Sequence, residues 1–138
     1  MRELSLNVMD IAQNSISAGA SLITIRVEED RPADTLSISV EDNGKGMSPE
    51  TVQKVIDPFY TTRTTRKVGL GVPFFKMAAL MTGGDFSIQS QVGKGTRVRA
   101  VFGLTHIDRM PLGNMADTMC ILMGCNEQIN FSFTYQVG

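Results

Sequence analysis

The residues best suited to chemistry in this chain are a carboxylate and two glycines, Asp42-x-Gly44-x-Gly46, followed by Met47. Apolar and polar residues alternate over residues 35–41, which predicts a strand that ends at the carboxylate. Glycine lets the backbone turn sharply and approach a flat ligand closely. A carboxylate beside such a turn can accept a hydrogen bond from an exocyclic amine such as that of adenine. The same pattern also occurs in ordinary loops, so by itself it leaves both interpretations open.

A second group of short polar side chains lies near the N-terminus, on a helix predicted over residues 4–18. One face of this helix is apolar: Leu4, Val8, Ile11 and Ala12. The opposite stripe carries Asn7, Asp10, Asn14 and Ser17. Asp10 and Asn14 are one turn apart and can reach a common point. The stripe is either a ligand-binding face or an ordinary solvated surface.

Residues 57–68 show no apolar periodicity and carry three cations, Arg63, Arg66 and Lys67. They are either a solvated linker or a lid whose cations meet an anion. The sequence Gly69-Leu70-Gly71 follows, and Pro73 predicts the first turn of a helix that ends at Met81. Glycines just before a helix leave backbone N–H groups free for phosphate. The spacing matches neither a P-loop nor a dinucleotide-binding fingerprint.

The elements that must position these groups are two predicted hairpins and a short helix. The strands are expected at residues 21–28, 35–41, 85–92 and 95–102. Turns at residues 31–34 and 93–94 would join them in antiparallel pairs. Ser48 as N-cap and Pro49 after it predict a short helix over residues 51–56.

The C-terminal part carries apolar patterns of its own. A helix is predicted over residues 112–122, with Met115 and Met119 on one face. Residues 129–135 alternate and include three aromatic side chains, which predicts a fifth strand. The apolar side of this tail must be covered. The strand therefore either adds to a sheet edge or pairs with a second subunit.

Composition excludes several classes of function. The chain has 138 residues, of which 42% are hydrophobic and 20% charged, with a formal net charge of −1. This length forms a core without disulfide bonds, and the charge gives no sign of a nucleic-acid or membrane partner. No apolar run approaches the ~20 residues of a membrane span. Two cysteines, one histidine and the lack of a signal-peptide core predict a reduced, cytoplasmic setting.

Taken in order, the motifs resemble those of the GHKL superfamily of ATP-binding domains, which includes gyrase, heat-shock chaperone, histidine-kinase and mismatch-repair ATPases. The motifs are Asp10-x-x-x-Asn14, Asp42-x-Gly44-x-Gly46, Asp57-Pro58-Phe59-Tyr60, Gly69-x-Gly71 and Gly93-Lys94-Gly95-Thr96. The resemblance covers residues 1–102. It leaves 103–138 as a C-terminal extension that packs on the same domain or forms a dimer. It implies a Bergerat-type two-layer α/β sandwich: a mixed, mostly antiparallel sheet with helices on one face and the nucleotide between helices and lid.

Different stretches resemble different branches of the superfamily. Residues 57–62 and the short lid are most similar to the histidine-kinase catalytic domain, although Gly69-Leu70-Gly71-Val72 departs from that group's usual Gly-Leu-Gly-Leu. Residues 13–20 are more similar to the mismatch-repair branch. The anti-sigma-factor serine kinases are also similar and, like this chain, lack a histidine-bearing dimerisation domain.

The resemblance implies a role for each matching residue. Asn14 would ligate Mg²⁺ that bridges the phosphates, and Asp42 would accept the adenine amine, with Thr96 supporting it directly or through water. Gly44 and Gly46 would let the base lie against the backbone. Nucleotide contacts are implied for these and for Met47 and Phe59. Phosphate would bind at Gly69, Leu70 and Gly71, with Arg66 or Lys67 closing over it.

Two residues have an ambiguous role. Hydrolysing members place glutamate at the position of Asp10. The shorter aspartate acts as general base, orients a Mg²⁺-bound water, or does neither. Residues 106–112 match the phospho-acceptor box of histidine kinases at His106 and three other positions, but they follow the last core strand rather than precede the domain. A structural or capping histidine is therefore the favoured interpretation.

Two functions of different class follow from the resemblance. The first is Mg²⁺-dependent ATP binding by a stand-alone histidine-kinase-like domain, with phosphoryl transfer to a protein partner or slow hydrolysis in signalling. The second is a nucleotide-sensing module without turnover that controls a partner as anti-sigma factors do. A degenerate scaffold is the third alternative. The expected ligands are ATP or ADP and Mg²⁺, with an unidentified protein partner and a homodimer through residues 103–138.

Overall fold

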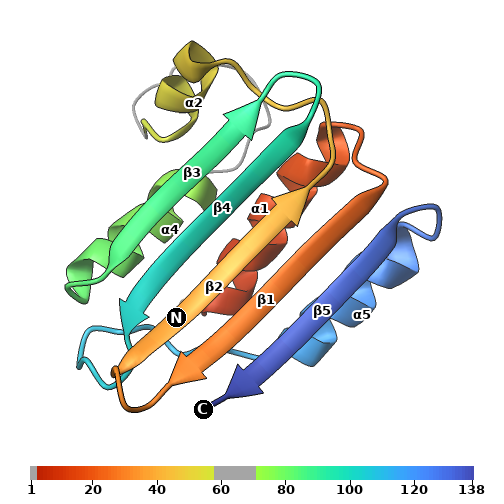
Figure 1. Cartoon of the computed structure of the whole chain (residues 1–138). Helices are drawn as coiled ribbons and strands as arrows, with labels where there is room; N and C mark the ends of the chain where they lie inside the picture. The colour runs from red at the N-terminus through yellow and green to blue at the C-terminus, as the bar shows by residue number, and fades with distance from the viewer. Residues whose placement is uncertain (1–2, 58–70) are drawn as a thin grey trace.

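The computed structural model describes residues 3–57 and 71–138 (Figure 1). In chain order the elements are α1 (Leu4–Ser17), β1 (Leu22–Asp30), β2 (Thr35–Asp42), α2 (Pro49–Val55), α4 (Gly71–Met81), β3 (Asp85–Gln91), β4 (Gly95–Gly103), α5 (Met115–Cys125) and β5 (Asn130–Val137). None of the helices in these two ranges has both the length and the apolar character needed to cross a membrane.

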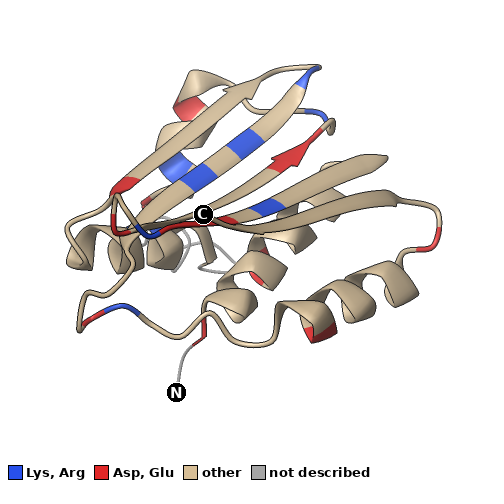
Figure 2. Ribbon diagram, turned by 60° about the horizontal axis from the view of Figure 1, so that its bottom comes forward, with Lys and Arg blue, Asp and Glu red and all other residues tan. Residues whose placement is uncertain are grey.

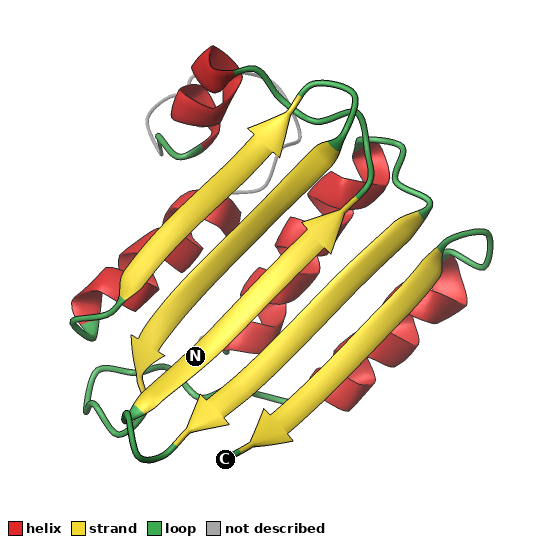
Figure 3. Cartoon of the chain, in the orientation of Figure 1, coloured by secondary structure: helices red, strands yellow, loops and turns green. Residues whose placement is uncertain are grey.

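The strands form one five-stranded sheet in the order β3-β4-β2-β1-β5 (Figure 3). Every neighbouring pair is antiparallel except β1 and β5, which are parallel. Helices α1, α4 and α5 all lie on one face, as Figure 2 shows from the side. The predicted two-layer α/β sandwich with a mixed, mostly antiparallel sheet is therefore confirmed.

The alternation along each strand explains the two layers. On β2, Leu36, Ile38 and Val40 are buried under the helices. The residues between them, such as Ser39 and Glu41, face away from the helices, and no described element covers that face of the sheet. The buried residues of β1 and β4 continue the same apolar layer, so the sheet has one core face and one polar face.

The helix α5 begins three residues later than the sequence predicts. The carbonyl oxygens of Pro111 and Leu112 accept hydrogen bonds from the backbone N–H groups of Leu4 and Ser5, at 2.9 and 2.8 Å. Residues 111–112 therefore satisfy free N–H groups at the start of α1 instead of starting their own helix. Asn114 then caps α5 by accepting the N–H of Asp117 at 3.0 Å.

The predicted fifth strand adds to the sheet edge as β5, next to β1. The alternative of pairing with a second subunit is thus not needed to place the strand. The short helix also forms, starting at Pro49 with Ser48 as its cap. The division of the chain at residue 102 remains a prediction, although the extension packs on the same sheet and helices.

The turn at Gly46 provides the first test of this fold. Gly46 has φ +71°, and a Cβ there would overlap the backbone carbonyl of Gln91 on the β3–β4 hairpin. Gly93 has a similar φ of +82° with no atom within 4 Å of such a Cβ. Gly93→Ala should therefore cost about 1–2 kcal/mol of unfolding free energy for the left-handed conformation. Gly46→Ala should cost a further ~1–3 kcal/mol for the overlap.

Urea denaturation of the two variants measures this difference. Equal losses would show that the hairpin moves away from the 44–46 turn at no cost, contrary to the close packing described here.

Candidate functional site

A cavity of about 830 Å³ lies between the helices and one end of the sheet. It is lined by α1, α2, the start of α4 and the ends of β2, β3 and β4 that meet at Asp42 and Thr96. Apolar side chains such as Val40, Val72 and Val98 make up much of the wall, with a few polar groups among them. A volume of this size and a lining of this kind are typical of small-molecule sites.

Asp42 is the carboxylate in this cavity, and two donors hold it in place. Its Oδ2 atom accepts the hydroxyl of Ser15 at 2.6 Å, and its Oδ1 atom accepts the backbone N–H of Gly44 at 2.8 Å. A carboxylate has about four acceptor sites, so lone pairs are left for a ligand. Asp42 is half-buried and lines the cavity, so a donor in the cavity can reach it.

Ser15 is a site residue that the sequence reasoning missed. It is buried on the core side of α1, one turn after Ile11, and its hydroxyl is held by Asp42. A hydroxyl on the apolar face of a helix requires a buried partner. The sequence contains that signal, because Ser15 lies four residues after Ile11 on the apolar face of α1 and not on its polar stripe.

Asn43, beside Asp42, has a structural role. Its Oδ1 atom accepts the backbone N–H groups of Ser21 and Leu22 at 2.9 and 3.0 Å, and its Nδ2 atom donates to the Ser21 hydroxyl at 2.9 Å. These bonds join the end of β2 to the start of β1. The neighbouring carboxylate of Asp42 is therefore not needed to hold the two strands together.

Thr96 lies directly across from Asp42 in the β2–β4 register and lines the same cavity. Its hydroxyl bonds with that of Ser90 at 2.7 Å, and no direct bond with Asp42 is seen. Ser90 also accepts the backbone N–H of Met47 at 2.7 Å and donates to the carbonyl of Gly95 at 3.0 Å. Thr96 thus shares a network with Ser90, which the sequence reasoning missed, and support of Asp42 through water remains a prediction.

The glycine turn is packed between α1 and the β3–β4 hairpin. A Cβ on Gly44 would come within 2.9 Å of the Cβ and the carbonyl oxygen of Ala18. Lys45 donates its N–H to that carbonyl at 2.9 Å and accepts the N–H of Gly93 at 2.7 Å. The fold itself therefore requires glycine at 44 and 46. Gly46 and Met47 also line the cavity, as a base-binding turn would.

Asn14 also lines the cavity, and its side-chain amide makes no hydrogen bond with another described residue. A free amide oxygen on the cavity wall suits a single protein ligand to Mg²⁺, which usually keeps waters and takes its other ligands from phosphates. Within residues 3–57 and 71–138, no cluster of three His, Cys, Asp or Glu side chains could hold a metal. The donor set thus fits an ion that arrives with a phosphorylated ligand.

Asp10 lies outside the cavity lining, one turn before Asn14. It faces the first residue of α4, because a Cβ on Gly71 would be 2.6 Å from the Cβ of Asp10. The surrounding protein removes part of the hydration of the Asp10 carboxyl, and this desolvation raises its pKa above the ordinary value. Asp10 and Gly71 therefore meet about one helical turn from Asn14, toward the N-terminal end of α1.

Several predicted ligand contacts lie outside the described residues: Phe59, Arg66, Lys67, Gly69 and Leu70. Of the described cations, Lys45 and Lys54 line the cavity, and the sequence reasoning assigned neither to the site. Lys45 sits between the two glycines of the 44–46 turn, so the motif itself contained the signal.

His106 lies far from this cavity. It follows β4 at Gly103, whereas Thr96 and the cavity are near the start of β4, about 25 Å away at ~3.3 Å per residue. The Nδ1 atom of His106 accepts the N–H of Asp108 at 3.0 Å within its own turn. This bond within its own turn supports the capping interpretation of His106.

Comparisons with known proteins agree with this geometry. Residues 1–106 match the family described as histidine kinase-, DNA gyrase B-, and HSP90-like ATPase. A putative sensor protein of Shewanella frigidimarina is 32% identical over 109 residues, which are 78% of this chain and 17% of that protein. Sensor protein SrrB of Staphylococcus aureus is 35% identical over 101 residues, 70% of this chain and 17% of SrrB. The chain thus spans about a sixth of these relatives' length.

Among solved structures, the Aquifex aeolicus MutL ATPase domain complexed with ADP has the same fold. The TM-score is 0.57 at 15% sequence identity, over 97% of this chain and 60% of that one. The family match covers more than half of the chain and includes every described residue that lines the cavity. The chain therefore belongs to the histidine kinase-, DNA gyrase B- and HSP90-like ATPase family.

Proposed function

We propose that this chain binds Mg²⁺–ATP in the cavity at Asp42, with the adenine amine donating to the carboxylate. Membership of the ATPase family supports ATP binding in general terms. The observation that carries the assignment is the position of Asp42: half-buried, inside the cavity, and held by Ser15 and Gly44 with lone pairs to spare. A fixed acceptor of this kind selects a ligand that presents a donor.

The same carboxylate would discriminate between purines. Adenine presents an amine where guanine presents a carbonyl oxygen, and two acceptors facing each other repel. ATP should therefore bind more tightly than GTP. A site built to pair with a donor rejects an analogue without one, because its buried acceptor is then left unpaired.

The phosphates would extend along α1 away from the base. Ser15 bonds to Asp42, Asn14 is next to it, and Asp10 is one turn of ~5.4 Å earlier, beside the first residue of α4. Asn14 would hold Mg²⁺, and the ion would supply charge neutralisation for the phosphates. Asp10, whose pKa is raised by desolvation, faces the first residue of α4, and the phosphates would extend toward it.

We further propose that bound ATP is used in signalling, by phosphoryl transfer to a protein partner or by slow hydrolysis. The resemblance of residues 57–62 to histidine kinases and the similarity to two sensor proteins support this proposal. A nucleotide sensor without turnover is the second candidate, favoured by the shorter side chain of Asp10. A homodimer through residues 103–138 remains a prediction.

Replacing Asp42 tests the base-binding role. Asp42→Asn should weaken ATP binding by about 10- to 150-fold, since a hydrogen bond to a charged group contributes ~1.5–3 kcal/mol. Glu41→Gln is the matched control: it removes the same charge one residue away, on the sheet face opposite the cavity. Calorimetric titration with ATP and GTP measures both variants. Unchanged ATP affinity in Asp42→Asn would overturn the proposal.

Replacing Asn14 tests its proposed role as a ligand of Mg²⁺. In the wild type, Mg²⁺ should strengthen ATP binding, and Mg²⁺–ATP should raise the unfolding temperature because only the native state binds it. Asn14→Ala should abolish most of the Mg²⁺ dependence, while Ser17→Ala, also on the cavity wall, should keep it. A wild type with no thermal shift in Mg²⁺–ATP would instead identify a degenerate scaffold.

Asp10 distinguishes turnover from sensing. If Asp10 is the base, Asp10→Asn should reduce phosphate release by roughly 100-fold or more while ATP still binds. Only the unprotonated carboxylate can act. Since its folded-state pKa is raised, the wild-type rate should fall on acidification at a higher pH than for an ordinary aspartate. Phosphate release equal to that of wild type in Asp10→Asn, with ATP bound, would favour the sensor.

A further inference from the structure

The outer edge of β5 carries backbone groups that no described residue pairs with. The N–H groups of Asn130 and Gly138 donate to the carbonyls of Ser21 and Glu29 on the β1 side, at 2.9 and 2.8 Å. Along a strand, successive residues direct their N–H and C=O groups to opposite sides. The even-numbered residues therefore bond to β1. The four odd-numbered residues direct one N–H and one C=O each away from β1, eight backbone groups in total. These residues are Phe131, Phe133, Tyr135 and Val137.

This edge lacks the features by which proteins usually protect an edge strand. From Asn130 to Gly138 the sequence contains no charged residue and no proline. The strand is eight residues long and regular over its whole length. Such an edge is a template for another strand.

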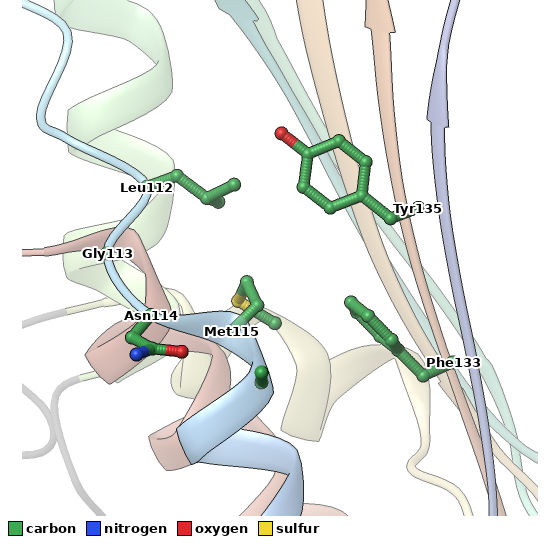
Figure 4. Close-up of a pocket in the computed structure, with 7 residues that line it drawn as sticks. Leu112, Gly113, Asn114, Met115, Phe133 and Tyr135 are labelled. Carbon is green, nitrogen blue, oxygen red and sulfur yellow. The ribbon is translucent and has the colours of Figure 1, made fainter.

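An apolar hollow of about 610 Å³ lies directly beneath this edge. It is bounded by Phe133 and Tyr135 on β5 and by residues 112–116 at the start of α5. Figure 4 shows the two aromatic rings on one side of the open space, with Leu112 and Met115 on the other. The side chains of Phe133 and Tyr135 are 37% and 45% exposed. An added strand could place alternate apolar side chains in this hollow.

The position of α5 indicates what kind of strand fits. In the face-on views, α5 is visible beyond the outer margin of β5, and not beneath the middle of the sheet (Figures 1 and 3). A single extended segment beside β5 would lie over α5. A second copy pairing its own β5 here would bring its own α5 to the same place, so the two helices would collide. The geometry points to one strand without a helix of its own at this margin.

We propose that the free edge of β5 is a docking site for an extended segment of a protein partner. The segment would add to the sheet as a further strand, with its N–H and C=O groups paired to the four outward-directed residues. Its apolar side chains would alternate toward the hollow above α5, and its polar ones toward the open face. The β5 edge and the β3 edge are the two opposite edges of the sheet. The proposal does not depend on nucleotide binding.

The test uses a fluorescein-labelled peptide of alternating valine and threonine with lysine at both ends. Its fluorescence anisotropy should rise saturably with wild-type protein. Tyr135→Pro removes one outward N–H without breaking a bond to β1 and should weaken binding at least tenfold, whereas the control Tyr135→Val should not. Thermal unfolding and ATP titration show whether each variant is folded. A wild type that does not bind the peptide, or equal binding by Tyr135→Pro, would overturn the proposal.

Hydrogen exchange provides an independent readout by residue. In the free protein, the amides of residues 131, 133, 135 and 137 should exchange quickly, and those of 132, 134 and 136 slowly. The peptide should slow the first group alone. A concentration-dependent dimer in sedimentation equilibrium that Tyr135→Pro dissociates would assign the edge to a second copy and refute the partner strand.

Discussion

The hydrogen bond between the Ser15 hydroxyl and the Asp42 carboxylate is the interaction on which the site depends. It connects the helix layer to the sheet at the point where the cavity opens, and its length of 2.6 Å is typical of a bond to a charged oxygen. Both groups need it: the buried hydroxyl obtains a partner, and the carboxylate obtains a fixed direction. Within the described ranges no buried side-chain nitrogen or oxygen lacks a partner.

This bond accompanies the rotation of α1 that burial of its apolar face fixes. With Ser15 facing the sheet, Asn14 faces the cavity, and Asp10, about one turn earlier, faces the start of α4. The candidate metal-binding and catalytic positions on α1, and the serine that holds Asp42 of β2, therefore depend on one helix orientation. A change that rotated α1 would move Ser15, Asn14 and Asp10 together, so the roles of these residues are best separated by substitutions that leave the Ser15–Asp42 bond in place.

The glycine turn shows that fold and site share residues. Ala18 packs against Gly44 from one side, and Gln91 and Gly93 approach Gly46 and Lys45 from the other. The turn thus joins α1 to the β3–β4 hairpin while it forms part of the cavity wall. Loss of ligand binding after a glycine substitution there would mix two causes. Asp42→Asn keeps the volume of the side chain and an oxygen that can accept the Gly44 N–H, so it changes the chemistry with less effect on this packing.

Sequence reasoning recovered what local pattern determines. Alternation located all five strands, and Asn14 of the polar stripe on α1 lines the cavity. It missed what depends on distant partners. Nothing near Ser15 or Ser90 in the chain reveals that they bond to Asp42 and Met47.

The predicted start of α5 was wrong for the same reason, because it too depends on a distant partner. The helix begins after residues 111–112 because the carbonyls of Pro111 and Leu112 bond to the first turn of α1, more than a hundred residues earlier in the chain. Hydrophobic periodicity describes one element at a time. It therefore cannot show that the end of one segment is used to complete the end of another.

The two proposed binding surfaces lie in different halves of the sheet, and α1 lies between them. The cavity is formed at β2, β3 and β4, whereas the free edge is on β5. Among the described helices, α1 packs against both α4 beside the cavity and α5 beneath the edge. Coupling between nucleotide and partner would therefore require a movement of α1 that each ligand favours differently. If the Ser15–Asp42 bond holds α1 in one orientation, the two sites act independently. The affinity for the partner strand is then the same whether or not nucleotide is bound.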